Sequence, residues 1–336
     1  MIKKHIVIPV FVPHKGCPFD CIFCNQKIIS GQITEADEND IRKTIEDHLG
    51  TSGDAFVEIG FYGGSFTGIP MEEQKRYLEI GYSYIKAGKV NNLRLSTRPD
   101  YISTGILDLL QAYGVKTIEL GAQSLDAAVL SCSNRGHNME SVLEASEMIK
   151  SRGISLGIQT MIGLPEDTRE KALETAQKVI GIGPDIVRIY PTLVIKNTYL
   201  QKLYETGKYL PLTLEEAVDI SAQLLQRYED NNINVIRIGL QPTESISENG
   251  EVIAGPFHPA FRQLVQSRLI RNKLEKYFHE HKIYNFNEII IECNTKNVSD
   301  IIGQKRENII LLKNNFNISR IKVVGNESVS SFNVKT

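Results

Sequence analysis

The sequence contains little that suits an extracellular or membrane-bound protein. Its 336 residues include five cysteines; an odd number with one dense cluster argues against a disulfide framework and for a reducing cytoplasm. No apolar run is long enough to span a membrane. The run after Lys3 and Lys4 is short, is broken by Pro9 and Pro13 and lacks a cleavage site, so we expect a strand there and no membrane partner. The formal net charge of -2 gives no overall attraction to nucleic acid.

Three of the five cysteines, Cys17, Cys21 and Cys24, form a C-x3-C-x2-C group directly after an apolar run over residues 6–12. Such a group offers three thiolates to one metal centre and no fourth, which leaves a tetrahedral structural zinc incomplete. An iron-sulfur cluster held by three thiolates keeps one iron open for an outside ligand. A loop of unrelated reduced thiols is the alternative, and the dense spacing makes it the weaker interpretation.

Short apolar runs alternate with helical patterns along the first two thirds of the chain, which predicts βα units and a parallel sheet. The expected strands cover residues 6–12, 56–61, 93–96, 117–120, 155–161 and 186–190. A long helix over 213–228 and one more strand over 235–238 follow. Parallel βα folds place their chemistry at the carboxyl ends of the strands, and the cysteine group follows the first of them.

Glycines and polar residues follow the other strands. Gly63 and Gly64 come after the second strand, where adjacent glycines let a backbone approach a ligand, although an ordinary turn is the alternative. Polar side chains after the third and fourth strands suit hydroxyl and carboxylate groups of a ligand, with a solvated loop as the alternative. We interpret His137 as a polar residue at a helix start.

The last third of the chain carries a different pattern. After a polar turn over 244–251, we expect an amphipathic helix over 261–278, a strand over 288–292, a helix over 298–313 and a strand over 318–324. The sequence therefore predicts an α/β region over 1–245, a linker with a helix over 246–284, and a small β-α-β unit over 285–336.

The cysteine group, with the aromatic Phe23 before its last member, resembles the signature of the radical S-adenosylmethionine (radical SAM) superfamily. The resemblance implies a partial (β/α)6 barrel with a [4Fe-4S] cluster on the three cysteines. It also implies one-electron reduction by an external flavodoxin- or ferredoxin-type donor, cleavage of S-adenosylmethionine to a 5′-deoxyadenosyl radical, and no catalytic residue beyond the cluster.

The same resemblance assigns the strand ends to S-adenosylmethionine, with Phe23 also in the cofactor site. It places the amino group of the methionyl moiety at Gly63, Gly64 and Ser65, the ribose at Ser96 and Gln123, the carboxylate at Arg135, and the adenine at the backbone near Gly163 and Pro165. Many members carry an acidic residue at the position of Ser65.

Strings over 61–67, 97–100, 119–124, 134–137 and 187–192 resemble the radical SAM domain of the catalytic subunit of Elongator, which modifies the wobble uridine of transfer RNA. The resemblance covers most of residues 5–245 and implies tRNA or other RNA as a substrate. Candidates for substrate contact are Arg188, Tyr190, Lys196 and His258, each with a structural role as the alternative. The first two cysteines lie closer together than in that subunit, and too few residues follow 245 for its acetyltransferase domain, so we do not expect acetyl-group chemistry in this sequence.

The stretch over 298–309 resembles the loop region of KH domains, which clamps a nucleic-acid backbone. Lys305 and Arg306 are the candidate RNA contacts, and Arg306 stands where such domains have their second glycine. A capping β-α-β unit with a solvated basic turn is the alternative.

Two other functions remain open at this point. Porphyrinogen oxidase-like radical SAM enzymes share the C-x3-C-x2-C spacing. A non-catalytic iron-sulfur or zinc protein that binds RNA or assists assembly would also use the three cysteines.

Overall fold

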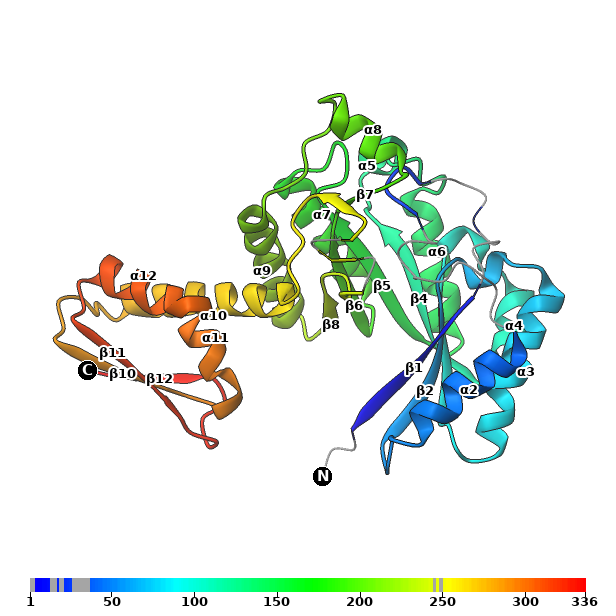
Figure 1. Ribbon diagram of the computed structural model, residues 1–336, viewed down its shortest axis with the longest axis horizontal. Coiled ribbons are helices and arrows are strands. Elements are labelled where there is room, and N and C mark those ends of the chain that lie inside the picture. Colours follow the sequence, from blue (N-terminus) through cyan, green and yellow to red (C-terminus); the bar gives the residue numbers. More distant parts are fainter. Residues whose placement is uncertain (1–3, 13–16, 18–20, 26–36, 244–245, 248–249) are drawn as a thin grey trace. The chain divides into compact units, whose positions relative to one another are not determined.

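The structure is a computed structural model (Figure 1). It describes residues 4–12, 17, 21–25, 37–243, 246–247 and 250–336. The chain divides into two compact units. The first comprises Met1–Thr213 and Tyr228–Phe257, and the second comprises Leu214–Arg227 and His258–Thr336.

A curled sheet of parallel strands forms the centre of the first unit (Figure 1). Its order is β1 (His5–Phe11), β2 (Phe56–Tyr62), β3 (Asn92–Thr97), β4 (Val115–Gln123), β5 (Ser155–Ile162), β6 (Ile186–Pro191) and β8 (Asn234–Ile238). Each hydrogen-bonded pair of neighbours is parallel. Because β1 and β8 stand at the two ends of this order, the sheet is open, and the predicted partial barrel is confirmed with the seventh strand included.

Helices connect successive strands. They are α2 (Glu38–Leu49), α3 (Met71–Lys86), α4 (Thr104–Ala112), α5 (Ala127–Cys132), α6 (Met139–Ser151), α7 (Arg169–Ile182), α8 (Tyr199–Glu205) and α9 (Leu214–Asp230), with short 3-10 turns η1 (Phe66–Gly68) and η2 (Pro99–Tyr101). Polar caps fix several starts: Asp37 forms a capping box with Asp40, and the Asn138 side chain accepts from the Ser141 amide at 3.0 Å.

The two faces of the sheet differ in polarity because successive strand residues point to opposite sides. On β2, Val57, Ile59 and Phe61 are buried apolar residues, whereas Glu58 and Tyr62 occupy the alternate face. Short antiparallel strands β7 (Val194–Ile195) and β9 (Val252–Ala254) add a small second sheet that the sequence did not predict, because two or three residues are too few for a periodic signal.

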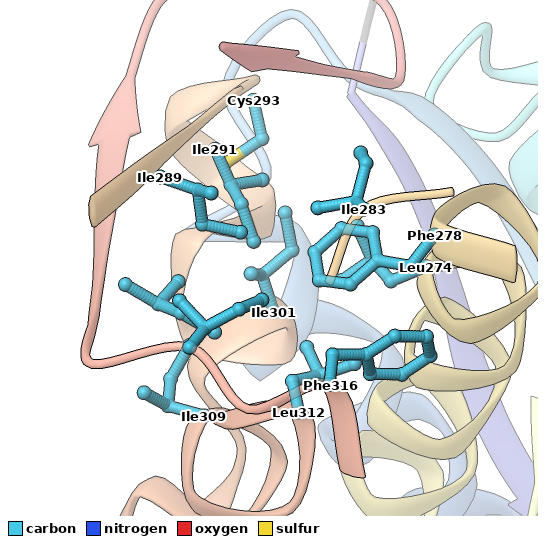
Figure 2. Close-up of a cluster of buried hydrophobic side chains, with 12 residues drawn as sticks. Leu274, Phe278, Ile283, Ile289, Ile291, Cys293, Ile301, Ile309, Leu312 and Phe316 are labelled. Atoms are coloured by element: carbon cyan, nitrogen blue, oxygen red, sulfur yellow. The ribbon is translucent and has the colours of Figure 1, made fainter. Parts of the chain in front are cut away.

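The second unit has its own hydrophobic core (Figure 2). Its elements are α10 (Phe261–Glu280), β10 (Glu288–Cys293), η3 (Thr295–Asn297), α11 (Val298–Ile302), η4 (Gln304–Arg306), α12 (Glu307–Phe316), β11 (Arg320–Gly325) and β12 (Phe332–Lys335). Strand β10 lies between β11, to which it is parallel, and β12, to which it is antiparallel. Phe278 of α10 meets Phe316 of α12 edge to face, with ring centroids 5.0 Å apart.

The prediction of one helix over 298–313 is wrong, because the chain leaves the helix at Ile302 and re-enters it at Glu307. Gly303 has φ 75° and ψ 164°, and Lys305 and Arg306 have φ values of 50° and 64°. Residues with a Cβ seldom adopt positive φ, so the break is unusual for Lys305 and Arg306. The apolar spacing of the sequence continues across it and does not signal it. Among the described residues, no helix has both the length and the apolarity to cross a membrane.

Candidate functional site

A cavity of about 860 Å³ runs along the polar inner face of the first unit. Residues from β1 to β6 and from β8 line it, together with the three cysteines. It therefore extends from the inside of the open barrel to the carboxyl ends of its strands, where parallel βα folds place their ligands.

The cysteine loop is fixed at Ile22. The Ile22 amide donates to the carbonyl of Ser133 at 3.2 Å, and the Ile22 carbonyl accepts from the Leu200 amide at 2.8 Å. The Ile22 side chain packs in an apolar cluster with Val194, Leu200 and Tyr209, and Phe23 packs against the same cluster. Segments far apart in the sequence thus hold the backbone between the second and third cysteines.

Cys17, Cys21 and Cys24 all line the cavity, Cys21 being buried and the other two half-buried. Within the described part of the chain, no three thiol, imidazole or carboxylate groups come close enough to enclose a metal ion. Burial raises the pKa of the Cys17 thiol, while a hydrogen bond from the Ser65 backbone and the charge of Arg135 act in the opposite direction. Metal binding requires the thiolate, so a metal would complete the deprotonation.

Arg135 lies against the cysteine loop with unused donor capacity. It is 6% exposed; its Nη1 is 3.3 Å from Cys21 Sγ and its Nη2 donates to the Gly121 carbonyl at 2.5 Å. Its Nε is buried without a hydrogen-bond partner. A buried guanidinium nitrogen is rarely left unsatisfied, so Arg135 has donor capacity for a ligand that carries a carboxylate.

The glycine turn after β2 approaches the backbone of the chain after β1. Gly63 has φ 108°, and a Cβ there would lie 2.9 Å from the Val12 carbonyl oxygen, so only glycine fits. Ser65 is buried, and its hydroxyl accepts from the Arg98 amide at 3.2 Å and hydrogen-bonds the Thr97 hydroxyl at 2.8 Å. Ser65 therefore joins two strand ends.

Most residues predicted to bind the cofactor line this one cavity. They are Phe23, Gly63, Gly64, Ser65, Ser96, Gln123 and Arg135. Gln123 has φ 68° and accepts from Gln159 Nε2 at 3.2 Å. Their individual contacts to a cofactor stay predictions.

Gly163 and Pro165 do not line the cavity, although Met161 just before them does. The Gly163 amide donates to the Asp167 carboxylate at 2.8 Å, and its carbonyl accepts from the Tyr209 hydroxyl at 2.6 Å. A Cβ at Gly163, where φ is 74°, would lie 2.8 Å from Leu212. The turn after β5 is thus held on three sides by side chains that sequence patterns did not indicate.

The predicted substrate and RNA residues separate into different places. Arg188 and Tyr190 line the cavity, whereas Lys196 does not and pairs with Glu251 at 3.2 Å. His258 belongs to the second unit, where its Nδ1 accepts from the Ala260 amide at 3.1 Å. Lys305 and Arg306 are exposed on the turn between α11 and α12 of that unit.

His137 directly precedes Asn138, the N-cap residue of α6. Burial, reinforced by the charge of Arg135, lowers the pKa of His137 to about 4, so the imidazole is neutral at neutral pH. This position agrees with its interpretation as a polar residue at a helix start.

Sequence patterns also missed a buried ion network on the inner face of the barrel. Arg94 donates to Glu119 at 2.7 Å and to Glu58 at 3.1 Å, and all three residues are 4% exposed. Arg188 forms an ion pair through its Nε with the other carboxylate oxygen of Glu119. It donates through Nη1 to the Tyr190 hydroxyl and through Nη2 to the Tyr62 hydroxyl, each at 3.2 Å.

These contacts control the ionisation of the network. Burial works against the charged form of Arg188, but Glu119 and the tyrosines outweigh it and raise its pKa. Burial and the Glu119 charge raise the pKa of Tyr62. The signal for this network in the sequence is a charged residue alternating with apolar ones inside a strand, as at Glu58, Arg94 and Glu119.

A curled, open parallel sheet with a three-cysteine loop at one strand end defines a partial-barrel enzyme that carries out its chemistry at the carboxyl ends of its strands. The comparisons with known proteins specify the family. The profile of the radical SAM superfamily matches residues 11–179, half of the chain, and that of the radical SAM C-terminal domain matches residues 184–271. The chain belongs to the radical SAM superfamily and is a radical SAM enzyme, as the sequence predicted.

Related sequences include an uncharacterized protein of Methanocaldococcus jannaschii, 29% identical over 65% of both chains. The Elongator complex protein 3 of Saccharomyces cerevisiae is 32% identical over 50% of this chain and 34% of its own. The tRNA uridine(34) acetyltransferase of Methanocaldococcus infernus is 29% identical over 49% of this chain and 34% of its own. The chain thus spans 65% of the first relative and about a third of the other two.

Two solved structures share the fold. Archaeal Elp3 of Methanocaldococcus infernus with its N-terminus deleted has a TM-score of 0.64 at 22% identity, covering 84% of this chain and 64% of its own. Coproporphyrinogen III oxidase of Escherichia coli has a TM-score of 0.50 at 17% identity, covering 68% of this chain and 53% of its own. The family implies a [4Fe-4S] cluster and S-adenosylmethionine.

Proposed function

We propose that Cys17, Cys21 and Cys24 hold the [4Fe-4S] cluster and that S-adenosylmethionine binds beside it. The observation that carries the proposal is the cavity that all three thiols share with Arg135, whose buried Nε has no partner. When bound, the two cofactors supply reductive cleavage of the sulfonium to a 5′-deoxyadenosyl radical, with the electron from a flavodoxin- or ferredoxin-type protein.

The side chains around this site bind, orient and exclude water. Arg135 offers a charged donor to the carboxylate of the methionyl group, and the glycine turn at Gly63 and Gly64 gives the amino group close access to backbone carbonyls. Ser96 and Gln123 face the same cavity with groups suited to ribose hydroxyls. For the adenine we propose the backbone near Gly163 and Pro165, which follows the cavity-lining Met161.

The experiment is anaerobic reconstitution with iron and sulfide, followed by a dithionite assay for 5′-deoxyadenosine. Cys24→Ala is expected to lose cluster absorbance and product formation. Cys132→Ala, which removes an exposed cysteine outside the group, is the matched control and is expected to retain both. A fully loaded wild-type cluster that forms no product would reject the proposal, and zinc without iron would favour the non-catalytic alternative.

We further propose that the substrate is an RNA nucleotide, most simply in tRNA. The support is the identity of 29% to 32% with proteins named tRNA uridine(34) acetyltransferase and Elongator complex protein 3. Arg188 and Tyr190 are the proposed substrate contacts in the cavity, and Lys196 and His258 are further candidates that lie outside it. RNA that copurifies with the protein, sequenced for modifications lost in a deletion strain, tests this substrate class.

The turn between α11 and α12 is the proposed second contact with RNA. Gly303 opens it, and Lys305 and Arg306 present exposed positive charge. Charge reversal at both residues is expected to weaken RNA binding and to lower its salt dependence, since each lost phosphate contact reduces counterion release. The same reversal at exposed Lys276 and Lys322 of the same unit is the control; equal effects of both double variants would refute a specific contact.

A further inference from the structure

The inner face of the barrel carries more positive than negative charge. Of the arginines that line the cavity, Arg94, Arg188 and Arg237 belong to β3, β6 and β8, and Glu58 and Glu119 are the carboxylates bonded to the network. The first two arginines share the two carboxylates between them. Among the described residues, the positive charge of Arg237 is therefore left without a carboxylate partner.

Arg237 lies on β8 at the open edge of the sheet and lines the cavity. Among the described residues its hydrogen-bond partner is neutral: its Nη1 donates to Gln241 Oε1 at 2.9 Å. No carboxylate of that part of the chain forms an ion pair with it. Its guanidinium keeps most of its five donor positions available.

The register of the sheet places the charge of Arg237 next to another positive charge, which is unfavourable for folding. Arg237 is the direct neighbour of Arg188 on the adjacent parallel strand, so both side chains project from the same region of the sheet. Like charges in adjacent positions on a sheet are destabilising. Glu119 pairs with Arg188, but in the part of the chain that the structure describes it forms no hydrogen bond or ion pair with Arg237. The position therefore favours an anionic ligand.

The wall around Arg237 combines polar and apolar groups. Gln241 and Thr243 line the cavity beside it, and the Thr243 hydroxyl accepts from the Ile246 amide at 3.0 Å while its own hydrogen remains able to donate. Leu240 and Ile246 line the same wall and belong to an apolar cluster. An anion next to an apolar surface matches a phosphate attached to a compact apolar ring or base.

We propose that Arg237 is the anchor of a phosphate-binding subsite at the open edge of the barrel, with Gln241 and Thr243 as neutral donors and Leu240 and Ile246 as the apolar wall for the attached base. This subsite deepens the proposed function, on which it rests for the nucleotide character of the substrate. The phosphate belongs either to a phosphodiester within RNA or to a free nucleotide.

The test compares ligands that differ only in a phosphate. The full-length reconstituted protein with S-adenosylmethionine is titrated calorimetrically with uridine and with uridine 5′-monophosphate. We expect wild type to bind the monophosphate about ten-fold more tightly, as for a charged hydrogen bond. Arg237→Gln is expected to bring the ratio close to one, and Arg237→Lys to restore part of it because the charge returns.

Arg76→Gln is the matched control, since Arg76 is exposed on α3 and stacks over the Tyr77 ring at 5.6 Å; it is expected to keep the wild-type ratio. Equal or absent binding of the two ligands in wild type, or a ratio that survives Arg237→Gln, overturns the subsite. Circular dichroism confirms that each variant is folded.

A second titration identifies the source of the phosphate. With an unmodified tRNA transcript, Arg237→Gln is expected to lower the slope of log affinity against log salt by about 0.7 if a phosphodiester binds there. An unchanged slope together with a lost monophosphate preference assigns the subsite to a free nucleotide. Formation of 5′-deoxyadenosine by wild type tests the proposed function separately, because the uridine titrations do not depend on it.

Discussion

At the scale of single residues, Glu119 is the residue on which the inner-face network depends. It accepts from Arg94 at 2.7 Å and from Arg188 Nη2 at 3.0 Å while being 4% exposed. Removing one partner of a buried ion pair leaves an uncompensated charge, which typically costs 3–5 kcal/mol, roughly. We expect Glu119→Gln to lower the free energy of unfolding by about that amount in urea denaturation.

The control for this loss is an exposed ion pair. Glu72 accepts from Lys75 at 2.9 Å with its side chain 84% exposed, and such pairs contribute about 0–1 kcal/mol. Glu72→Gln is expected to change stability by less than about 0.5 kcal/mol. If the two substitutions lower the free energy of unfolding by the same amount, the stability of the network does not depend on Glu119.

Asp167 gives the stability a pH dependence. Burial raises the pKa of its carboxyl to about 6, above the value of about 3.9 in an unfolded chain. The folded state therefore binds the proton more tightly, and this contribution to stability is complete below about pH 4 and lost as the pH rises through 6. Asp167→Asn keeps an acceptor for the Gly163 amide and cannot ionise.

We expect Asp167→Asn to be more stable than wild type at pH 7.5, by about 1–3 kcal/mol, with the difference disappearing near pH 4 in a series of urea titrations. Asp126 provides a control of opposite sign, because its hydrogen bond from the Val129 amide lowers its pKa. Asp126→Asn should destabilise at pH 7.5. An Asp167→Asn variant that is less stable than wild type at pH 7.5 would contradict the assignment.

At the scale of elements, the segment from α8 to Leu212 connects two parts of the site. The Leu200 amide holds the cysteine loop at Ile22, and the Tyr209 hydroxyl holds the Gly163 carbonyl. Tyr209→Phe removes one hydrogen bond of about 1 kcal/mol and keeps the ring in its apolar cluster. We therefore expect a several-fold weaker affinity for S-adenosylmethionine in equilibrium dialysis, with unchanged iron and sulfide content.

Tyr204→Phe is the matched control, since Tyr204 packs against the same apolar cluster. It is expected to leave the affinity for S-adenosylmethionine unchanged. Binding of methionine alone should be the same in both variants, because the proposed function assigns only the adenine to the Gly163 turn. Equal losses in the two variants would show that Tyr209 acts only through packing.

Elements with local signals could be predicted from the sequence. The cysteine spacing, the strand periods and the glycine turn at Gly63 are each contained within a few residues, and the structure places them in one partial barrel. The network around Glu119 could not be predicted, because it requires the register between strands that are distant in the chain. The break at Gly303 was missed for another reason: helix-like apolar spacing continues across it.

At the scale of the whole molecule, the chain carries two hydrophobic cores. Phe278 is fully buried in the core of the second unit, and Ile45 is fully buried under the sheet of the first. Truncating a buried phenylalanine to alanine costs about 3–5 kcal/mol. In calorimetry we expect Phe278→Ala to destabilise the second unit while iron loading by reconstitution stays at the wild-type ratio.

Ile45→Ala is the reciprocal variant and is expected to lower the stability of the first unit and its iron loading together. Loss of iron in Phe278→Ala without loss in Ile45→Ala would contradict this expectation, because the cluster site would then depend on the core of the second unit. The sequence analysis grouped His258 and Arg188 as candidate substrate contacts, but the two residues belong to different units.

The anchoring of Ile22 has a consequence for the order in which the protein matures. The cysteines precede both of their anchors in the chain, because the amide that holds their loop belongs to Leu200 and the carbonyl to Ser133. Contacts between such distant residues form late, after the intervening chain has been synthesised and its loop closed. Stable insertion of the iron-sulfur cluster should therefore wait until the barrel is nearly complete, which leaves the thiols exposed to oxidation during synthesis.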